Sequence, residues 1–203
     1  MANRLSACMI VKDESEFIED CLKSLEDVVD EVVVVDTGST DGTQDLVRSF
    51  PKAKLIEIVW DDDFAKARNV SLEHATGDWI LIIDADERLH PDDASRLRKL
   101  IRSATADAYY LDVLNFPDHP DNTVVSKRIG LFRRRPDIRF ENRIHEQVDL
   151  SVARAKLRVE LSHIRLLHYG YDPEVRKKKR KSERNRRLIA LALQDDRENS
   201  FMN

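Results

Sequence analysis

The sequence predicts an α/β fold, in which a mostly parallel sheet is flanked by helices and is followed by a smaller mixed or antiparallel second half and a C-terminal helix. Two observations support this class. Apolar strand-like runs alternate with segments of helical period as far as residue 83, and short strand-like segments without intervening helices follow between residues 108 and 168. Alternating strands and helices pair in parallel through right-handed crossovers. The 203 residues, 41% of them hydrophobic, are enough for one domain with a substantial core.

The first half contains four predicted strands and three predicted helices. The strands are short apolar runs, rich in β-branched residues, as expected when both faces of a sheet are buried; they cover residues 5–11, 31–35, 53–59 and 79–83. Apolar residues at helical spacing predict helices at 17–25 and 43–50, and a third that follows residues 61–63 and runs through Ala75. Ser15 is a candidate N-cap of the first helix, and Gly77 suits the C-terminal end of the third.

The second half has weaker signals. Pro91 is predicted to open a helix, because Leu97, Leu100 and Ile101 form one apolar stripe behind it. A surface loop is expected at 115–123, which contains two prolines and two aspartates. The predicted strand segments are 108–113, 124–134, 138–140, 144–150, 157–159 and 164–168. We expect this half to pack beside the first sheet, and we expect Asp172-Pro173 to cap a final helix.

Charge divides the chain into an acidic body and a basic end. Residues 172–203 hold ten Lys or Arg against six Asp or Glu, whereas residues 1–171 carry a net charge of −8. An acidic body argues against nucleic acid as the main ligand and fits a site that recruits a metal ion. The basic stretch at 176–187 is interpreted as a solvated helix face, with peripheral contact with an anionic surface, such as a membrane, as the alternative.

Other sequence features exclude several classes of protein. The chain shows neither an apolar run of membrane-spanning length nor a signal-peptide pattern at its start. Cys8 and Cys21 lie in apolar patterns and are predicted to be small core residues. We therefore expect a cytoplasmic location, with contact at a membrane surface as a further option. The glycine-rich fingerprints of dinucleotide-binding proteins and P-loop NTPases are missing from the sequence.

The most informative stretch is residues 79–87, where a buried strand ends abruptly in three carboxylates. Ligands bind outside the carboxyl ends of the strands in open α/β sheets. Asp84 and Asp86 are two residues apart, so in extended backbone they point to the same side. Such a pair suits a hard divalent cation and the phosphates that it carries. The alternative is a solvated acidic turn that caps a helix. The second strand runs similarly into Asp36, which is followed by glycines that permit a tight turn.

Several segments resemble the family 2 glycosyltransferases, which have the GT-A fold. Residues 32–43 contain the signature-like stretch Asp36-Thr37-Gly38-Ser39-Thr40-Asp41-Gly42, and Ala67-Arg68-Asn69, residues 75–79 and Asp84-Ala85-Asp86-Glu87 follow in the family's order. Residues 60–69, Arg143-Ile144-His145-Glu146 and His168-Tyr169-Gly170-Tyr171 are similar to bacterial members that often carry tetratricopeptide-like helices after the catalytic domain. The resemblance covers roughly residues 4–171.

The resemblance implies a domain organisation and an activity. Residues 1–171 would form the catalytic domain, with a nucleotide-binding half at 1–90 and an acceptor half at 91–171, and residues 172–203 would form a basic helical extension, with the start of helical repeats as one interpretation. The implied reaction moves a sugar, with inversion, from a nucleotide diphosphate sugar to an acceptor hydroxyl on a glycan, a lipid-linked molecule or a protein. Mn²⁺ or Mg²⁺ is the implied cofactor.

The resemblance also assigns residues to the donor site. Val11, Glu14 and Asp36 would line the nucleoside pocket, and a carboxylate at Asp36 can accept the imide N–H of uracil, which favours a uridine donor. The alternative for Asp36 is a purely local role in capping its own loop. Arg68 would reach the diphosphate or the base through its fork of donors. The remaining implied residues are Asp84 and Ala85 at the donor, and Asp86 and His168 at the metal ion.

The implied general base is Glu146, which would take the proton from the acceptor hydroxyl. His145 would orient Glu146 or contact the acceptor. The sequence departs from the family here, because many relatives have a Glu-Asp pair where this chain has His145-Glu146, and two adjacent aspartates where it has Asp36-Thr37. The alternative for Glu146 is an edge-strand charge. The alternative for the whole chain is a binding module that holds a nucleotide sugar or a partner without turnover.

Overall fold

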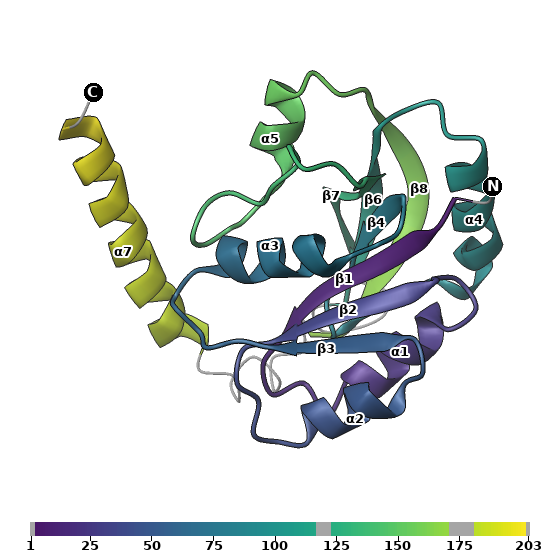
Figure 1. Ribbon diagram of the computed structural model, residues 1–203, viewed down its shortest axis with the longest axis horizontal. Coiled ribbons are helices and arrows are strands. Elements are labelled where there is room, and N and C mark those ends of the chain that lie inside the picture. The colour runs from purple at the N-terminus through teal and green to yellow at the C-terminus, as the bar shows by residue number, and fades with distance from the viewer. Residues whose placement is uncertain (1–2, 117–122, 171–180, 202–203) are drawn as a thin grey trace.

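The computed structural model describes residues 3–116, 123–170 and 181–201, and these contain one eight-stranded sheet (Figure 1). Its strands are Leu5–Val11 (β1), Glu31–Asp36 (β2), Ala53–Glu57 (β3), Trp79–Ile82 (β4), Glu87–Leu89 (β5), Ala108–Asn115 (β6), Val124–Arg133 (β7) and Val159–His168 (β8). The order across the sheet is β3-β2-β1-β4-β7-β6-β8-β5.

Helices cover both faces of this sheet. They are Ile18–Leu25 (α1), Thr43–Ser49 (α2), Phe64–His74 (α3), Ala94–Arg102 (α4) and Asp149–Arg154 (α5), and a short 3₁₀ turn, Pro91–Asp93 (η1), precedes α4. A further helix, Lys181–Phe201 (α7), extends away from the sheet (Figure 1). Along β2, Val32 and Val34 pack into the core that also contains residues of α1, α2 and α4, whereas Val33 packs into the core that contains residues of α3 and α5. Because successive side chains of a strand point to opposite faces, both faces must be apolar, which explains the continuous apolar runs.

The predicted parallel half is confirmed. β1 pairs in parallel with both β2 and β4, and β2 pairs in parallel with β3. The helices between these strands begin and end close to the predicted residues. Among the strands, β3 ends at Glu57, two residues before its predicted end. As a result, the carboxyl ends of β1, β2 and β4 lie at one edge of the sheet, and the loops that follow them meet there.

The second half is mixed, as predicted, but it does not form a separate layer beside the first sheet. β7 pairs antiparallel with β4 and with β6, and β8 pairs in parallel with β6, so the second half continues the same sheet. The segments predicted at 157–159 and 164–168 belong to the single strand β8. The three-residue strand β5, which pairs with β8, was not predicted.

The strand segments predicted at 138–140 and 144–150 are wrong. Residues 138–140 have no regular structure, residues 141–148 form a loop closed by an isolated bridge between Glu141 and Gln147, and α5 begins at Asp149. In this segment two backbone N–H groups donate hydrogen bonds to side chains and not to a neighbouring strand. The Phe140 N–H donates to Asn69 Oδ1 over 2.9 Å, and the Arg139 N–H donates to Ser151 Oγ over 3.1 Å. Apolar spacing by itself does not reveal such partners.

The C-terminal helix α7 is confirmed from Lys181 onward, while the predicted Asp172-Pro173 cap and residues 117–122 of the predicted loop lie outside the described residues. Its N-terminal end lies beside the loop that precedes α3, and its other end points away from the sheet (Figure 1). Leu188 is fully buried, whereas Leu193 is 58% exposed. Within the described part of the chain, no helix combines the length and the apolarity that crossing a bilayer requires.

Candidate active site

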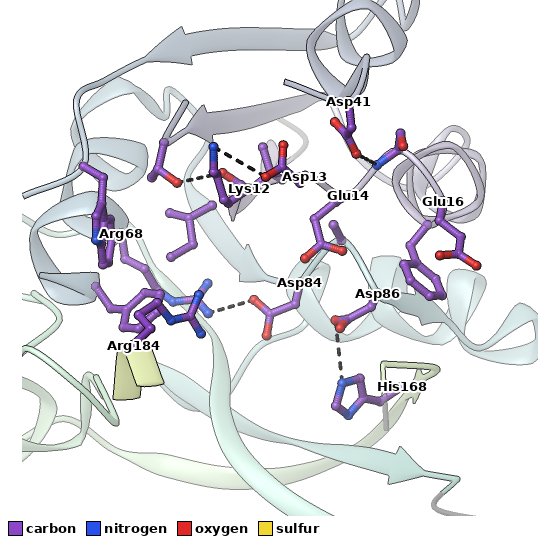
Figure 2. Close-up of a pocket in the computed structure, with 18 of the residues that line it drawn as sticks. Lys12, Asp13, Glu14, Glu16, Asp41, Arg68, Asp84, Asp86, His168 and Arg184 are labelled. Atoms are coloured by element: carbon purple, nitrogen blue, oxygen red, sulfur yellow. Dashed lines mark hydrogen bonds and ion pairs between the residues drawn. The ribbon is translucent and has the colours of Figure 1, made fainter. Parts of the chain in front are cut away.

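A cavity of about 1000 Å³ opens where the carboxyl ends of β1 and β4 meet the start of α3 (Figure 2). It lies at the edge of the sheet predicted to bind ligands. All of the predicted site residues except Asp36 and His145 line this cavity, namely Val11, Glu14, Arg68, Asp84, Ala85, Asp86, Glu146 and His168. Residues separated by more than 150 positions in the sequence are therefore brought together as predicted.

Arg68 lies at the centre of an ion-pair cluster. Its Nη2 donates to Asp84 Oδ1 over 2.7 Å and its Nε donates to Glu146 Oε1 over 2.8 Å. Burial favours the neutral form of the guanidinium, but the carboxylates of Asp84 and Glu146 outweigh this effect and raise the pKa of Arg68. The third nitrogen, Nη1, is buried and has no hydrogen-bond partner among the described residues. A buried donor without a partner is costly, so this nitrogen is suited to an acceptor oxygen of a ligand.

Asp84 is held from two sides. Besides Arg68, it faces Arg128 of β7, whose Nη1 lies 3.6 Å from Asp84 Oδ2. Burial alone would raise the pKa of the Asp84 carboxyl, but the two guanidinium groups hold it well below its usual range. Arg128 is itself fixed by Glu87, to which its Nη1 donates over 2.8 Å. Arg128 was not predicted, because a lone arginine within a strand gives no sequence signal.

Asp86 faces His168 across the end of β8. His168 Nε2 lies 3.6 Å from Asp86 Oδ1, and His168 Nδ1 lies 2.7 Å from Asn115 Oδ1. The Asn115 amide nitrogen donates to the carbonyls of Val113 and Val124, which fixes its oxygen toward the imidazole. Nδ1 must then carry the proton, so Nε2 is the nitrogen that can bind a cation. Desolvation opposes the charge on His168, but the carboxylate of Asp86 raises the pKa of the imidazole.

The Asp86–His168 pair fits a divalent cation that is shared with a ligand. A carboxylate oxygen and an imidazole nitrogen are both ligands of Mn²⁺. The described residues contain no cluster of three or more His, Cys, Asp or Glu arranged to hold a metal ion. The protein would therefore supply two ligands, and phosphate oxygens and water would supply the rest, as is usual for Mg²⁺ in phosphate sites.

Asp36 does not line the cavity, and its contacts are those of a loop cap. Its Oδ1 accepts hydrogen bonds from the backbone N–H groups of Gly38 and Ser39, each over 2.8 Å, and from Gln44 Nε2 over 3.0 Å. Gly38 has a φ of 100°, a conformation that favours glycine. The alternative in which Asp36 caps its own loop therefore accounts for the contacts of Oδ1. Oδ2, however, is buried and has no hydrogen-bond partner among the described residues.

The structure separates the two members of the His145-Glu146 pair. Glu146 lines the cavity, whereas His145 is exposed and does not. His145 also has a φ of 57°, so the backbone turns sharply just before Glu146. Arg68 Nε donates to Glu146 Oε1, so Oε2 is the carboxylate oxygen that this contact does not use. The edge-strand interpretation of Glu146 is wrong, because this segment is a loop.

Several cavity residues were not predicted to belong to the site. The loop after β1 contributes more side chains than expected, and Trp60 and Phe64, whose ring centroids are 4.8 Å apart, form an aromatic corner at the start of α3. Both aromatic residues belong to the stretch 60–69, whose resemblance to the family could have identified them as site residues. Arg184 of α7 also lines the cavity. The others are Ile10, Lys12, Asp13, Ser15, Glu16, Phe17, Thr37 and Asp41.

Comparison with solved structures identifies the fold of the protein. The fold is that of the GT-A glycosyltransferases, with helices on both faces of the sheet and a cavity beside the acidic loop after β4. It resembles S. aureus TarS in complex with UDP (TM-score 0.65, 20% identity, 81% of this chain and 60% of that chain). It also resembles the mannosyltransferase PcManGT from Pyrobaculum calidifontis in complex with GDP-Man and Mn²⁺ (TM-score 0.63, 20% identity, 83% and 57%).

The chain belongs to glycosyl transferase family 2, whose family model matches residues 6–170. A TPR repeat-containing protein of Synechococcus elongatus is 37% identical over 98% of this chain and 50% of its own length. The prophage-derived glycosyltransferase SunS of Bacillus subtilis is 29% identical over 94% of this chain and 45% of its own length. The chain thus spans about half the length of these two relatives. The predicted family and fold are confirmed.

Proposed function

We propose that this chain catalyses the transfer of a sugar from a uridine diphosphate sugar to an acceptor hydroxyl, with inversion and with Mn²⁺ or Mg²⁺ as cofactor. The observation that carries the proposal is the convergence of Asp86 and His168 with Arg68 and Glu146 in one cavity of a family 2 domain. The complexes of TarS with UDP and of PcManGT with GDP-Man and Mn²⁺ support a nucleotide sugar and a divalent cation.

The nucleoside would occupy the side of the cavity formed by Val11, Glu14 and Thr37. Asp36 supports the uridine assignment through Oδ2, a buried oxygen without a hydrogen-bond partner among the described residues, which can accept an imide N–H. Because Asp36 is fully buried, the loop that follows it would have to shift before a base could reach this oxygen. The assignment of uridine rests on this residue, while the diphosphate assignment rests on the opposite side of the cavity.

The diphosphate would lie against Arg68 and the Asp86–His168 pair. Arg68 Nη1, the buried donor without a described partner, can bind a phosphate oxygen while Asp84 and Glu146 keep the guanidinium oriented. Asp86 and His168 would hold the cation, which when bound offsets the negative charge that develops on the leaving diphosphate. Asp84, which two guanidinium groups already hold, would position this side of the site and contact the donor together with Ala85.

Glu146 would act as the general base. As the acceptor oxygen forms its bond to the anomeric carbon, the bond from that carbon to the phosphate oxygen breaks, and Glu146 Oε2 takes the hydroxyl proton. A single displacement inverts the configuration at the anomeric carbon. Glu146 also borders a smaller cavity of about 210 Å³, lined by Arg128 and Phe140 among others, which offers room for part of the acceptor.

We further propose the assignments of domains and location that the sequence suggested. Residues 1–90 would bind the nucleotide, residues 91–171 would contribute to the acceptor site, and the extension at 172–203 would lead toward helical repeats. The name of the Synechococcus relative, a TPR repeat-containing protein, supports the last point. The two free, buried thiols of Cys8 and Cys21 support a cytoplasmic location.

A panel of nucleoside diphosphates tests the donor and the cofactor together. With Mn²⁺ present, uridine diphosphate at 100 times its Kd should stabilise the protein by about 2.7 kcal/mol. For a chain of this size, this stabilisation corresponds to an increase in Tm of about 5–10 °C. The measurement is a thermal melt with each nucleoside diphosphate, with and without Mn²⁺. If the guanosine nucleotide gives the larger shift, uridine is the wrong base, and if no nucleotide shifts the melt, the proposal fails.

Substitution of Gly170 tests whether the Asp86–His168 pair must keep its geometry. A Cβ at residue 170 would lie 1.9 Å from Asp86 Oδ2 and 3.1 Å from His168 Nε2. Gly170→Ala should therefore displace both side chains and reduce sugar transfer about 100-fold, as expected when reacting groups move by roughly 1 Å. The measurement is kcat/KM for transfer, with Tm as the control for folding. Full activity with an unchanged Tm would contradict the role of this pair.

The competing function is a module that binds a nucleotide sugar without turnover. It shares every contact to the donor, so binding measurements do not distinguish the two functions. Incubation of the protein with the donor sugar and Mn²⁺, followed by assay of free nucleoside diphosphate, does distinguish them. Slow hydrolysis of the donor, in which water takes the sugar and free nucleoside diphosphate accumulates, would exclude the binding module if it requires Asp86 and continues for many turnovers.

A further inference from the structure

The first described turns of α7 dock on the loop at 60–64, which precedes and opens α3. Arg187 forms an ion pair with Asp62 of this loop. Asp62 is in turn fixed, because Trp60 Nε1 donates to Asp62 Oδ1 over 3.0 Å and because Arg143 Nη1 donates to the Asp62 carbonyl over 3.0 Å. The family model ends at residue 170, so α7 lies beyond the matched region.

This docking directs Arg184, one turn before Leu188, into the cavity. The Arg184 guanidinium carbon lies 5.0 Å from the centroid of the Phe64 ring, in cation–π geometry. In Figure 2 Arg184 lies on the same side of the cavity as Arg68, away from Glu16 and Asp41. The stretch at 176–187 was predicted to face solvent or an anionic surface. Arg184 instead lines the cavity, whereas Arg187 pairs with Asp62 while its side chain stays 69% exposed, and residues 176–180 lie outside the described residues.

No carboxylate in the described part of the chain pairs with Arg184. Among the described residues it makes no ion pair, and its Nε is buried without a hydrogen-bond partner. Burial lowers the pKa of the Arg184 guanidinium, and the more distant carboxylates of Glu146 and Glu14 offset this only in part. A partly desolvated cation with an unused donor is unfavourable, so the arrangement is suited to an anionic ligand.

We propose that Arg184 binds the diphosphate of the donor, and that the loop at 60–64 positions α7 for this contact. The inference rests on the proposed function, which makes the diphosphate the anion bound in this cavity. Arginine binds phosphate through paired donors, and Phe64 packs against the Arg184 guanidinium. The C-terminal helix is then part of the active site, although it lies outside the family match.

The test is the binding of uridine diphosphate and of uridine to the full chain with Mn²⁺, measured by calorimetry. Arg184→Ala should weaken uridine diphosphate binding about 10- to 100-fold, the range expected for loss of a hydrogen-bonded charged contact, and should leave uridine binding within twofold. Arg184→Lys should recover part of the loss. Arg186→Ala, on the exposed side of the same helix, is the matched control and should bind both ligands as the wild type does.

Other outcomes would overturn the inference. Equal losses for uridine and uridine diphosphate would place Arg184 at the nucleoside, and an unchanged Kd with an increased acceptor KM would place it at the acceptor. If the wild type binds no nucleoside diphosphate, the proposed function itself fails, whereas binding that Arg184→Ala leaves unchanged removes only the inference.

A second variant tests the docking loop separately. Asp62→Asn keeps an oxygen for Trp60, and asparagine tolerates the φ of 61° at this position, but the variant loses the charge that pairs with Arg187. It should weaken uridine diphosphate binding in the same direction as Arg184→Ala but by a smaller factor, about 2- to 5-fold, because an exposed ion pair contributes little. Unchanged binding in Asp62→Asn would show that the loop does not position Arg184.

Discussion

Replacement of Asp86 with asparagine is expected to reduce sugar transfer about 10³-fold, because the site loses the carboxylate that would hold the cation at the leaving diphosphate. The amide keeps the size of the side chain and can still contact His168, so the fold should be retained. The Mn²⁺-dependent part of the nucleotide-induced increase in Tm should disappear, while the Mn²⁺-independent part should persist. The measurements are kcat/KM for transfer and thermal melts with and without Mn²⁺.

Two controls make this result specific to Asp86. Asp27→Asn, at an exposed turn after α1, makes the same chemical change away from the cavity and should have no effect. Removal of the cation with a chelator should reduce wild-type activity to the level of Asp86→Asn and should not reduce that variant further, since the two perturbations remove one interaction. A Mn²⁺-dependent shift that survives in Asp86→Asn would place the cation elsewhere.

Replacement of Glu146 with glutamine is expected to reduce transfer about 10²- to 10⁴-fold, the range for loss of a general base. Glutamine matches glutamate in shape and can still accept a hydrogen bond from Arg68 Nε, which in the native protein donates to Glu146 Oε1 over 2.8 Å. Binding of the donor should therefore change little, and the loss should fall on kcat. The measurement is steady-state transfer together with the Kd for uridine diphosphate.

Glu73→Gln, on the exposed face of α3, is the matched control for Glu146→Gln and should retain full activity. Transfer that is unchanged in Glu146→Gln would remove Glu146 from the mechanism. A large loss of donor affinity with unchanged kcat would instead give Glu146 a positioning role, in which it orients Arg68 toward the diphosphate. His145 has no part in either outcome, because it does not line the cavity.

The region around Glu146 shows where prediction from the sequence failed. Residues 144–150 have the alternating pattern of an edge strand, but their backbone forms a loop and the start of α5. The determining contacts come from distant residues: Asn69 of α3 binds the backbone of Phe140 in both directions, and the Phe64 N–H donates to the Arg143 carbonyl over 3.0 Å. Local spacing does not encode these partners, so the periodicity favoured the wrong element.

The sequence by itself determined the parallel half of the fold and the edge at which the site lies. Apolar runs that end in Asp36 and Asp84 require buried parallel strands whose carboxyl ends meet, and that requirement follows from chain periodicity and crossover handedness alone. The tertiary structure decided which side chains share the cavity. It left Asp36 and His145 outside the cavity lining, fixed the His168 tautomer through Asn115, and brought Arg128 to Asp84 and Arg184 into the cavity. These placements depend on contacts between residues far apart in the chain, and their energies exist only once the sheet and α7 have packed together.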